Sequence, residues 1–212
     1  MSSAIMSNST LFRGLALIVA LLLSACATPP KPPVDSESLT WQLQGKIGFW
    51  QGRKQESATI NWAQCDADSA RIRLSGPLGA GSIELSSDQS GARLIQNGES
   101  IHADSIEELA SRADWPIPVE ALRFWVRGRA MFTEKLEGRV NTNGQLEELN
   151  QIGWHISYHY RTPFHQLPDR IHAKSANARI TLIVSEWQEQ PEFCAKQSKR
   201  SHCPAPLKSI YS

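Results

Sequence analysis

Short segments in which apolar and polar residues alternate recur along this chain of 212 residues. In Trp41–Phe49 the odd-numbered positions are apolar or glycine. Successive side chains of a β-strand point to opposite faces, so an alternation of period two predicts strands that bury one face. The same alternation marks residues 58–62, 70–74, 83–85, 154–160 and 180–184. Polar turns separate these segments, and this order is typical of an antiparallel meander.

Two segments of helical character interrupt the predicted strands. Ser105 and Glu108 have the spacing of a capping box, which predicts a short helix that ends near Arg112. A second helix is predicted over residues 119–127, with Gly128 in the position of a C-terminal cap. Its apolar face carries Ala121, Leu122, Trp125 and Val126. The simplest α+β arrangement is therefore a curved antiparallel sheet with a helical lid, around either a packed core or a lipid-sized hollow.

The N-terminal residues have the pattern of a bacterial lipoprotein signal. Apolar residues run from 15 to 23 after Arg13. This run is too short to cross a bilayer, which takes roughly 20 apolar residues. Residues 23–26, Leu-Ser-Ala-Cys, match the lipobox. We therefore expect residues 1–25 to be a signal peptide that is removed, and Cys26 to carry diacylglycerol and an N-linked acyl group. Ala27 and Thr28 follow Cys26, and because no Asp stands at the second position of the mature chain, the outer membrane is favoured as the location.

The remaining residues divide into a tether, a domain and a tail. Residues 26–38 are rich in proline, which predicts an extended, semi-rigid tether. Residues 39–188 are long enough for one domain with one core. Residues 189–212 lack periodicity and are expected to form a polar tail.

The cysteines and the charges limit the chemistry open to the chain. Besides Cys26 the chain holds Cys65, Cys194 and Cys203, so at least one thiol has no partner within the chain. Cys194 and Cys203 close a short loop and are the expected disulfide. Lys and Arg number 22 against 21 Asp and Glu, and the sequence shows no basic stripe. This balance argues against nucleic acid as a partner.

The candidate catalytic and metal-binding residues have simpler interpretations. His155 and His159 would suit a metal ion on a helix, but in a predicted strand they share the wetter face, so we expect no metal site. The adjacent carboxylates at 107–108 and 147–148 fit helix capping and solvated turns. The sequence has no Gly-x-Ser-x-Gly elbow. We therefore expect no catalytic residue and a protein that is not an enzyme.

Four short motifs occur in a distinctive order. They are Gly-Pro-Leu-Gly at 76–79, Trp-Pro-Ile-Pro at 115–118, Trp-Val-Arg-Gly at 125–128 and Gln-Ile-Gly-Trp at 151–154. Together with the lipobox, Trp41 and Trp62, they resemble the LolB family of outer-membrane lipoprotein receptors over about residues 40–187. Cys65 and the C-terminal tail are not part of the family pattern.

The resemblance implies an incomplete antiparallel β-barrel whose helical lid encloses an apolar cavity for acyl chains. It implies that the protein accepts lipoproteins from the loaded periplasmic carrier LolA and inserts their acyl chains among the phospholipids of the inner leaflet of the outer membrane. No cofactor is implied beyond the acyl groups on Cys26. Leu78 stands in a loop rich in Gly and Pro and is expected to engage the membrane. The residues expected to line the cavity are Trp62, Leu74, Leu122, Trp125 and Trp154.

Two other functions remain open from the residues alone. A structural or envelope-assembly lipoprotein would need only a solid β core. A lipid-modifying enzyme would need a catalytic residue that the sequence does not display. Uptake of an apolar fluorophore, or of cargo from LolA, by a soluble form that begins after Cys26 would distinguish a receptor from a structural lipoprotein.

Overall fold

The computed structural model of the protein describes residues 40–77, 81–112, 117–131, 137–189 and 191–195. All of these residues belong to one compact unit. The predicted signal peptide and tether, together with Cys26, Leu78 and Cys203, lie outside the described residues.

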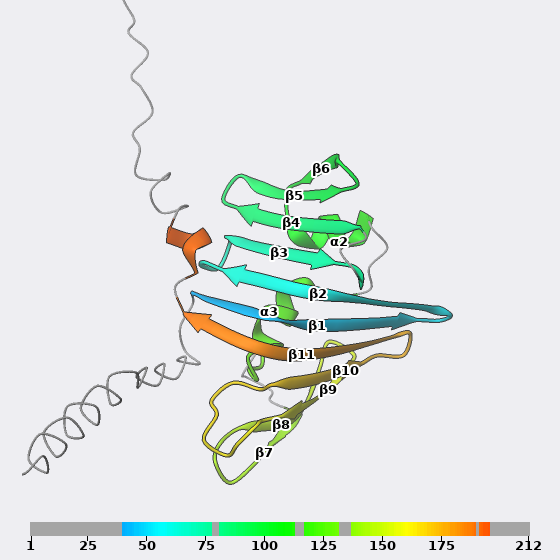
Figure 1. Ribbon diagram of the computed structural model, residues 1–212. Coiled ribbons are helices and arrows are strands. Elements are labelled where there is room, and N and C mark those ends of the chain that lie inside the picture. Colours follow the sequence, from blue (N-terminus) through cyan, green and yellow to red (C-terminus); the bar gives the residue numbers. More distant parts are fainter. Residues whose placement is uncertain (1–39, 78–80, 113–116, 132–136, 190, 196–212) are drawn as a thin grey trace, which may run out of the picture. The chain divides into compact units, whose positions relative to one another are not determined.

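The described residues form one antiparallel sheet of eleven strands (Figure 1). The strands are β1 Trp41–Gln51, β2 Lys54–Gln64, β3 Ala70–Ser75, β4 Ser82–Asp88, β5 Gly91–Gln96, β6 Glu99–Ala103, β7 Glu137–Val140, β8 Leu146–Gln151, β9 Trp154–His159, β10 Arg170–Lys174 and β11 Ala178–Glu189. Their order across the sheet is β6-β5-β4-β3-β2-β1-β11-β10-β9-β8-β7. Because β6 and β7 are its two edges, the sheet is not closed. The predicted incomplete antiparallel barrel is confirmed.

The first and last strands of the chain are neighbours at the centre of the sheet. β1 pairs with β2 on one side and with β11 on the other, which joins the N-terminal and C-terminal halves of the meander. The pairing with β11 shifts by one residue between Gln44 and Gly45. A Cβ atom at Gly45 would stand only 2.1 Å from the backbone oxygen of Ile183, so this bulge requires glycine.

The alternation of the sequence corresponds to one buried face of the sheet. Trp41 and Leu43 of β1 and Trp62 of β2 are almost fully buried. Ile156 of β9 and Leu182 of β11 extend the same core into the other half of the sheet. Each predicted strand coincides with an observed one, whereas β5, β6, β7, β8 and β10 are not among the predictions.

Two short helices, α2 (Ile106–Arg112) and α3 (Val119–Trp125), lie on one side of the sheet (Figure 1). Their buried residues join the core of the sheet, which is what a lid requires. The N-cap of α2 is confirmed, since Ser105 Oγ accepts a hydrogen bond from the Glu108 N–H at 3.1 Å, whereas the Glu108 carboxylate accepts from the Asp104 N–H at 2.9 Å.

Gly128 closes the segment after α3. The helix ends at Trp125, earlier than the predicted Arg127, and the Gly128 N–H donates to the Trp125 carbonyl at 2.9 Å. Gly128 has a φ of 69°, as a glycine cap requires. A Cβ atom there would lie 2.5 Å from the Tyr160 hydroxyl, so glycine is required for space as well as for conformation.

A disulfide attaches the C-terminal end of the described chain to the domain. Cys194 bonds Cys65, which follows β2, and their Cα atoms are 5.2 Å apart. The expected Cys194–Cys203 disulfide is therefore wrong. The short turn that contains Cys194 folds back onto the sheet, where the guanidinium of Arg71 lies 3.9 Å from the ring of Phe193. Residues 191–195, assigned to the polar tail from the sequence, thus contact the domain.

Candidate functional site

An apolar pocket of about 260 Å³ opens at the end of the sheet where β1 meets β2. Its apolar wall is formed by Ile47, Phe49, Ala58, Leu74, Ile83 and Ile117. Five of these residues come from the neighbouring strands β1 to β4, and Ile117 comes from the segment before α3. Glu56, Gln96 and Asn97 add polar groups to the lining. The pocket therefore combines an apolar wall with a few polar groups, the composition typical of a ligand site.

The loop that contains Leu78 is anchored at this pocket. Gly76 and Gly81 both line the pocket, and the Gly76 N–H donates to the Gly81 carbonyl at 3.2 Å. This hydrogen bond closes the base of the loop. Leu78 itself lies outside the described residues, so its expected contact with a membrane stays a prediction.

The five residues expected to line the cavity do not lie together: one lines the apolar pocket, one borders a second pocket, and three are packed in the core. Leu74 lines the apolar pocket. Trp62 is 2% exposed, and its Nε1 donates to Gln64 Oε1 at 3.1 Å. It borders a second, more polar pocket of about 470 Å³ that includes Arg123 of α3. Trp62 thus lies on the buried face but away from the apolar pocket.

Leu122, Trp125 and Trp154 are packed under the lid. Trp125 is completely buried, and its ring centre is 6.2 Å from that of Trp154. Leu122 is 9% exposed. None of the three lines the apolar pocket. Their expected contact with acyl chains is untested, and in this structure they contact one another and the rest of the core.

Sequence reasoning missed most of the apolar wall. Ile47, Phe49 and Ile83 occupy the apolar positions of predicted strands. The same alternation that predicts these strands places their side chains on one face, so a signal was present. The alternation does not indicate at which position along the strands the core is interrupted by a pocket.

Gln151 fastens the lid to the sheet. Its Oε1 accepts hydrogen bonds from Trp125 Nε1 at 2.9 Å and from the Met131 N–H at 3.0 Å. Gln151 ends β8, whereas Trp125 ends α3. Two of the motifs singled out in the sequence, 125–128 and 151–154, therefore meet in space through this side chain.

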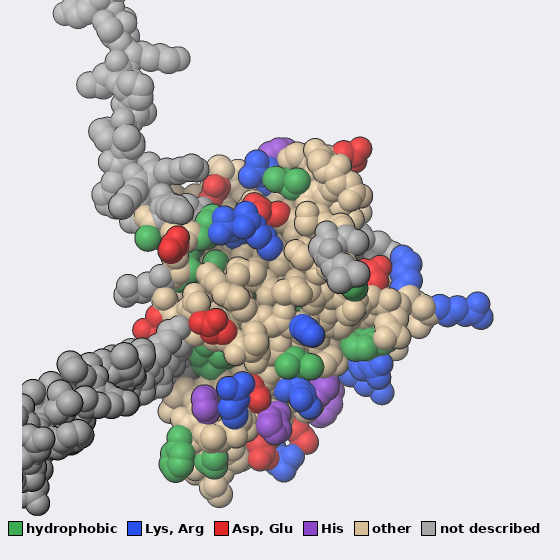
Figure 2. Space-filling model, viewed as in Figure 1, with side chains coloured by type: hydrophobic (Ala, Val, Ile, Leu, Met, Phe, Trp, Pro, Cys, Tyr) green, Lys and Arg blue, Asp and Glu red, His purple; other side chains and the backbone are tan. Residues whose placement is uncertain are grey.

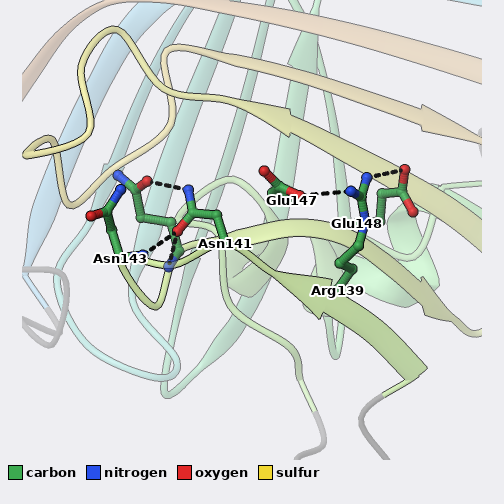
Figure 3. A network of polar contacts seen from close by, with 6 residues as sticks. Arg139, Asn141, Asn143, Glu147 and Glu148 are labelled. Carbon is green, nitrogen blue, oxygen red and sulfur yellow. Dashed lines mark hydrogen bonds and ion pairs between the residues drawn. The ribbon is translucent and has the colours of Figure 1, made fainter.

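The adjacent carboxylates Glu147 and Glu148 both bind Arg139 across the β7–β8 hairpin (Figure 3). The two N···O distances are 3.0 Å and 2.9 Å. Glu148, by hydrogen bond and charge, and then Glu147 raise the pKa of Arg139. In the turn of the same hairpin, Asn141 Oδ1 accepts backbone hydrogen bonds from Asn143 and Gln145. These polar groups hold a hairpin together and need no catalytic explanation.

The histidines of β9 face solvent, as predicted. His155 and His159 are both exposed, and their Nδ1 atoms lie 2.8 Å from oxygens of Asn150 and Asp169. The described residues contain no cluster of three or more His, Cys, Asp or Glu that could hold a metal ion. On the inner side of β9, burial raises the pKa of Tyr158 well above its ordinary value.

None of the helices formed by the described residues is both long and apolar enough to span a bilayer. The fold and the pocket instead define the class of open antiparallel half-barrels with a helical lid over an apolar interior. A family model described as outer membrane lipoprotein LolB matches residues 39–187. The chain belongs to the LolB family. It is an outer-membrane lipoprotein that faces the periplasm, as the sequence predicts.

Two relatives that carry the name LolB agree with this assignment. The outer-membrane lipoprotein LolB of Cellvibrio japonicus is 34% identical over 193 residues, which cover 82% of this chain and 95% of the relative. The LolB of Francisella tularensis subsp. tularensis is 31% identical over 192 residues, covering 82% and 92% of the two chains. Among solved structures, a LolA superfamily protein from Nitrosomonas europaea aligns with a TM-score of 0.42 at 10% identity, over 73% of this chain and 88% of the other.

Proposed function

We propose that the protein receives lipoproteins from the periplasmic carrier LolA and transfers their acyl chains to the inner leaflet of the outer membrane. Membership of the LolB family supports this role. The observation that carries the proposal is the apolar pocket whose lining includes both ends of the loop around Leu78. A site for an acyl chain and a segment suited to touch a membrane are adjacent there.

The physical reason for such a receptor is the cost of exposing acyl chains to water. Burial of each methylene is worth about 0.8 kcal/mol, so releasing three acyl chains would cost on the order of 30 kcal/mol. Passage through free solution is too slow at such a cost. Transfer therefore has to keep the chains in apolar contact, from the carrier to this pocket and then to the bilayer.

The pocket has to widen in order to hold a complete lipoprotein anchor. Its volume of about 260 Å³ is below the range of roughly 300–1,000 Å³ found for ligand pockets. Three acyl chains need more space than this. In this proposal the lid provides the space. Two hydrogen bonds to Gln151 hold the end of α3 and the following segment in place, and the pocket widens when these bonds break.

Two residues outside the described structure, Cys26 and Leu78, have roles in this proposal: the first anchors the receptor and the second contacts the membrane. In this proposal Cys26 carries diacylglycerol and an N-acyl group, which hold the receptor at the membrane without taking part in the transfer. Leu78 enters the phospholipid surface as the cargo leaves the pocket. The partners are thus loaded LolA, the acyl chains of the cargo and the phospholipid of the outer membrane, and no step requires an enzyme activity.

The test uses a soluble chain that begins at Ala27, mixed first with lipoprotein-loaded LolA and then with liposomes. Leu78→Glu should retain acceptance of cargo but lose delivery to the liposomes. Ile83→Glu is the matched variant, since it places a carboxylate in the apolar wall and should abolish acceptance. Failure of the unmodified soluble chain to accept cargo would refute the proposal. Equal loss of both steps in Leu78→Glu would refute the separate role of the loop.

A structural role in the envelope is the second candidate. It is favoured by the packed tryptophans of the core, among which Trp41 and Trp62 have ring centres 5.3 Å apart. A protein with only this role binds neither an apolar fluorophore nor cargo from LolA. The same acceptance assay therefore decides between the two candidates.

A further inference from the structure

The β1–β2 hairpin projects beyond the neighbouring strand β3 (Figure 1). Ser75, the last residue of β3, pairs with Thr59, whereas β1 and β2 continue to pair as far as Gln51 and Lys54. At about 3.3 Å per residue, the hairpin extends roughly 16 Å past the end of β3. On the other side of the hairpin, β11 accompanies β1 as far as the pair Gln51–Ala178, at the end of the sheet where the apolar pocket opens.

Exposed basic side chains gather at this end of the sheet, and two of them, Lys174 and Arg179, lie on its outer face. Trp50 of β1 pairs with Arg179 of β11, which in turn pairs with Lys174 of β10. Arg53 and Lys54 stand at the turn of the hairpin, and all four basic residues are exposed. We call Trp50, Arg53, Lys54, Lys174 and Arg179 the basic tip. Figure 2 shows Lys and Arg side chains gathered at the end of the molecule where the hairpin projects.

The aromatic member of the basic tip is held flat against the sheet. The guanidinium of Arg179 lies 4.3 Å from the centre of the Trp50 ring. A Cβ atom at Gly48 would stand 2.6 Å from the same ring, so glycine provides the space in which Trp50 lies. The tip therefore combines an amphipathic indole with cationic groups. Tryptophan is characteristic of the boundary between a bilayer and water.

The positive charge of the basic tip has no carboxylate to balance it among the described residues. No ion pair there involves Arg53, Lys54, Lys174 or Arg179. Glu56, the nearest acidic residue along the hairpin, lines the pocket and shares the strand face of Lys54, but no ion pair joins the two side chains among the described residues. On the outer face of β10, desolvation and then the charges of Arg170 and Arg179 lower the pKa of His172.

We propose that the basic tip binds the anionic phospholipid headgroups of the membrane that receives the cargo. The charges are complementary, and the indole of Trp50 suits the headgroup region. The proposal rests on the proposed function, because the pocket, whose lining includes Gly76 and Gly81, opens at the same end of the sheet. Contact of the basic tip with the bilayer brings the mouth of the pocket to the surface into which acyl chains are delivered.

The test measures partition of the soluble chain from Ala27 onto vesicles of phosphatidylcholine, with and without phosphatidylglycerol. This chain retains all eleven strands, the core and the disulfide. The test variant R53Q/K54Q/K174Q removes three charges that make no described hydrogen bond or ion pair, and it leaves the Arg179–Trp50 contact intact. The control R73Q/R93Q/R139Q removes the same number of exposed charges elsewhere on the sheet, although Arg73 and Arg139, unlike the residues of the test variant, pair with carboxylates. Thermal unfolding verifies that all three proteins are folded.

Partition onto vesicles with phosphatidylglycerol should fall on the order of a hundredfold in the test variant, at about fivefold for each charge, and should change little in the control. Acceptance of cargo from LolA should be unchanged in both. Equal partition of test variant and unmodified chain onto anionic vesicles would overturn the proposal. Loss of acceptance with normal vesicle binding would also overturn it, since the basic tip would then contact the carrier protein. Failure of acceptance by the unmodified chain would count against the proposed function alone.

Discussion

Replacement of Cys65 or Cys194 by serine removes the disulfide that attaches the C-terminal turn to the sheet. The two cysteines are 129 residues apart in sequence, and a loop of that length restricts the unfolded chain by about 5 kcal/mol at 25 °C. Measured losses for native disulfides are typically about 2–5 kcal/mol. The whole domain is expected to be stable by only about 5–15 kcal/mol, so either substitution removes a large share of its free energy of unfolding.

The assay is thermal and urea unfolding of the soluble chain under oxidising conditions, followed by circular dichroism. A loss of about 2–5 kcal/mol should lower the melting temperature by roughly 5–20 °C for a domain of this size. Cys65→Ser, Cys194→Ser and the double variant should have the same stability, because each lacks the same bond. Cys203→Ser is the matched control and should unfold like the unmodified chain.

The control also provides the result that would refute the reasoning. If Cys194 paired with Cys203, then Cys203→Ser would destabilise the protein and Cys65→Ser would have little effect. A reducing agent supplies an independent comparison, since it should bring the unmodified chain to the stability of the two single variants. It should not change either variant further.

Two other substitutions test the lid. Gln151→Leu removes the acceptor shared by Trp125 and Met131, so the free energy of unfolding should fall by about 1–3 kcal/mol. Uptake of an apolar fluorophore should become faster. An unchanged rate of uptake would show that Gln151 does not hold the lid closed. Gly128→Ala introduces a Cβ beside the Tyr160 hydroxyl at a positive φ and should cost about 1–3 kcal/mol in chemical unfolding, with a smaller loss when it is made in a Tyr160→Phe background. Equal losses in both backgrounds would contradict the steric explanation.

Three of the five strands that sequence reasoning missed lack the alternation on which it depends, whereas β5 and β10 do alternate, with Ala92 and Leu94 buried in one and Ile171 and Ala173 in the other. β7 is exposed along its whole length, and β6 is exposed at all but its last residue, so neither has a buried face to impose a pattern. In β8 the buried residues are Leu146 and Leu149, at a spacing that is closer to helical than to strand periodicity. These strands form because they pair with neighbours. Pairing of this kind leaves little trace in the residues of the strand itself.

The candidate site was predictable only in its parts. The Gly-rich loop, the two helices and the apolar positions of β1, β3 and β4 are all visible in the sequence, and Leu74 lines the pocket as expected. Leu122, Trp125 and Trp154 were equally good candidates by residue type, but they pack together under the lid. An apolar side chain looks the same in a sequence whether it borders a pocket or fills a core.

Local patterns therefore determined the elements of this protein: alternation predicted the central strands, Ser105 and Gly128 marked helix ends, and the lipobox indicated export. Only the tertiary structure decided which distant residues meet. It paired β1 with β11, attached Cys194 to Cys65 rather than to Cys203, and set the pocket and the basic tip at one end of the sheet. The physical reason is that such contacts join residues far apart in the chain, and their free energy depends on packing that no short segment contains.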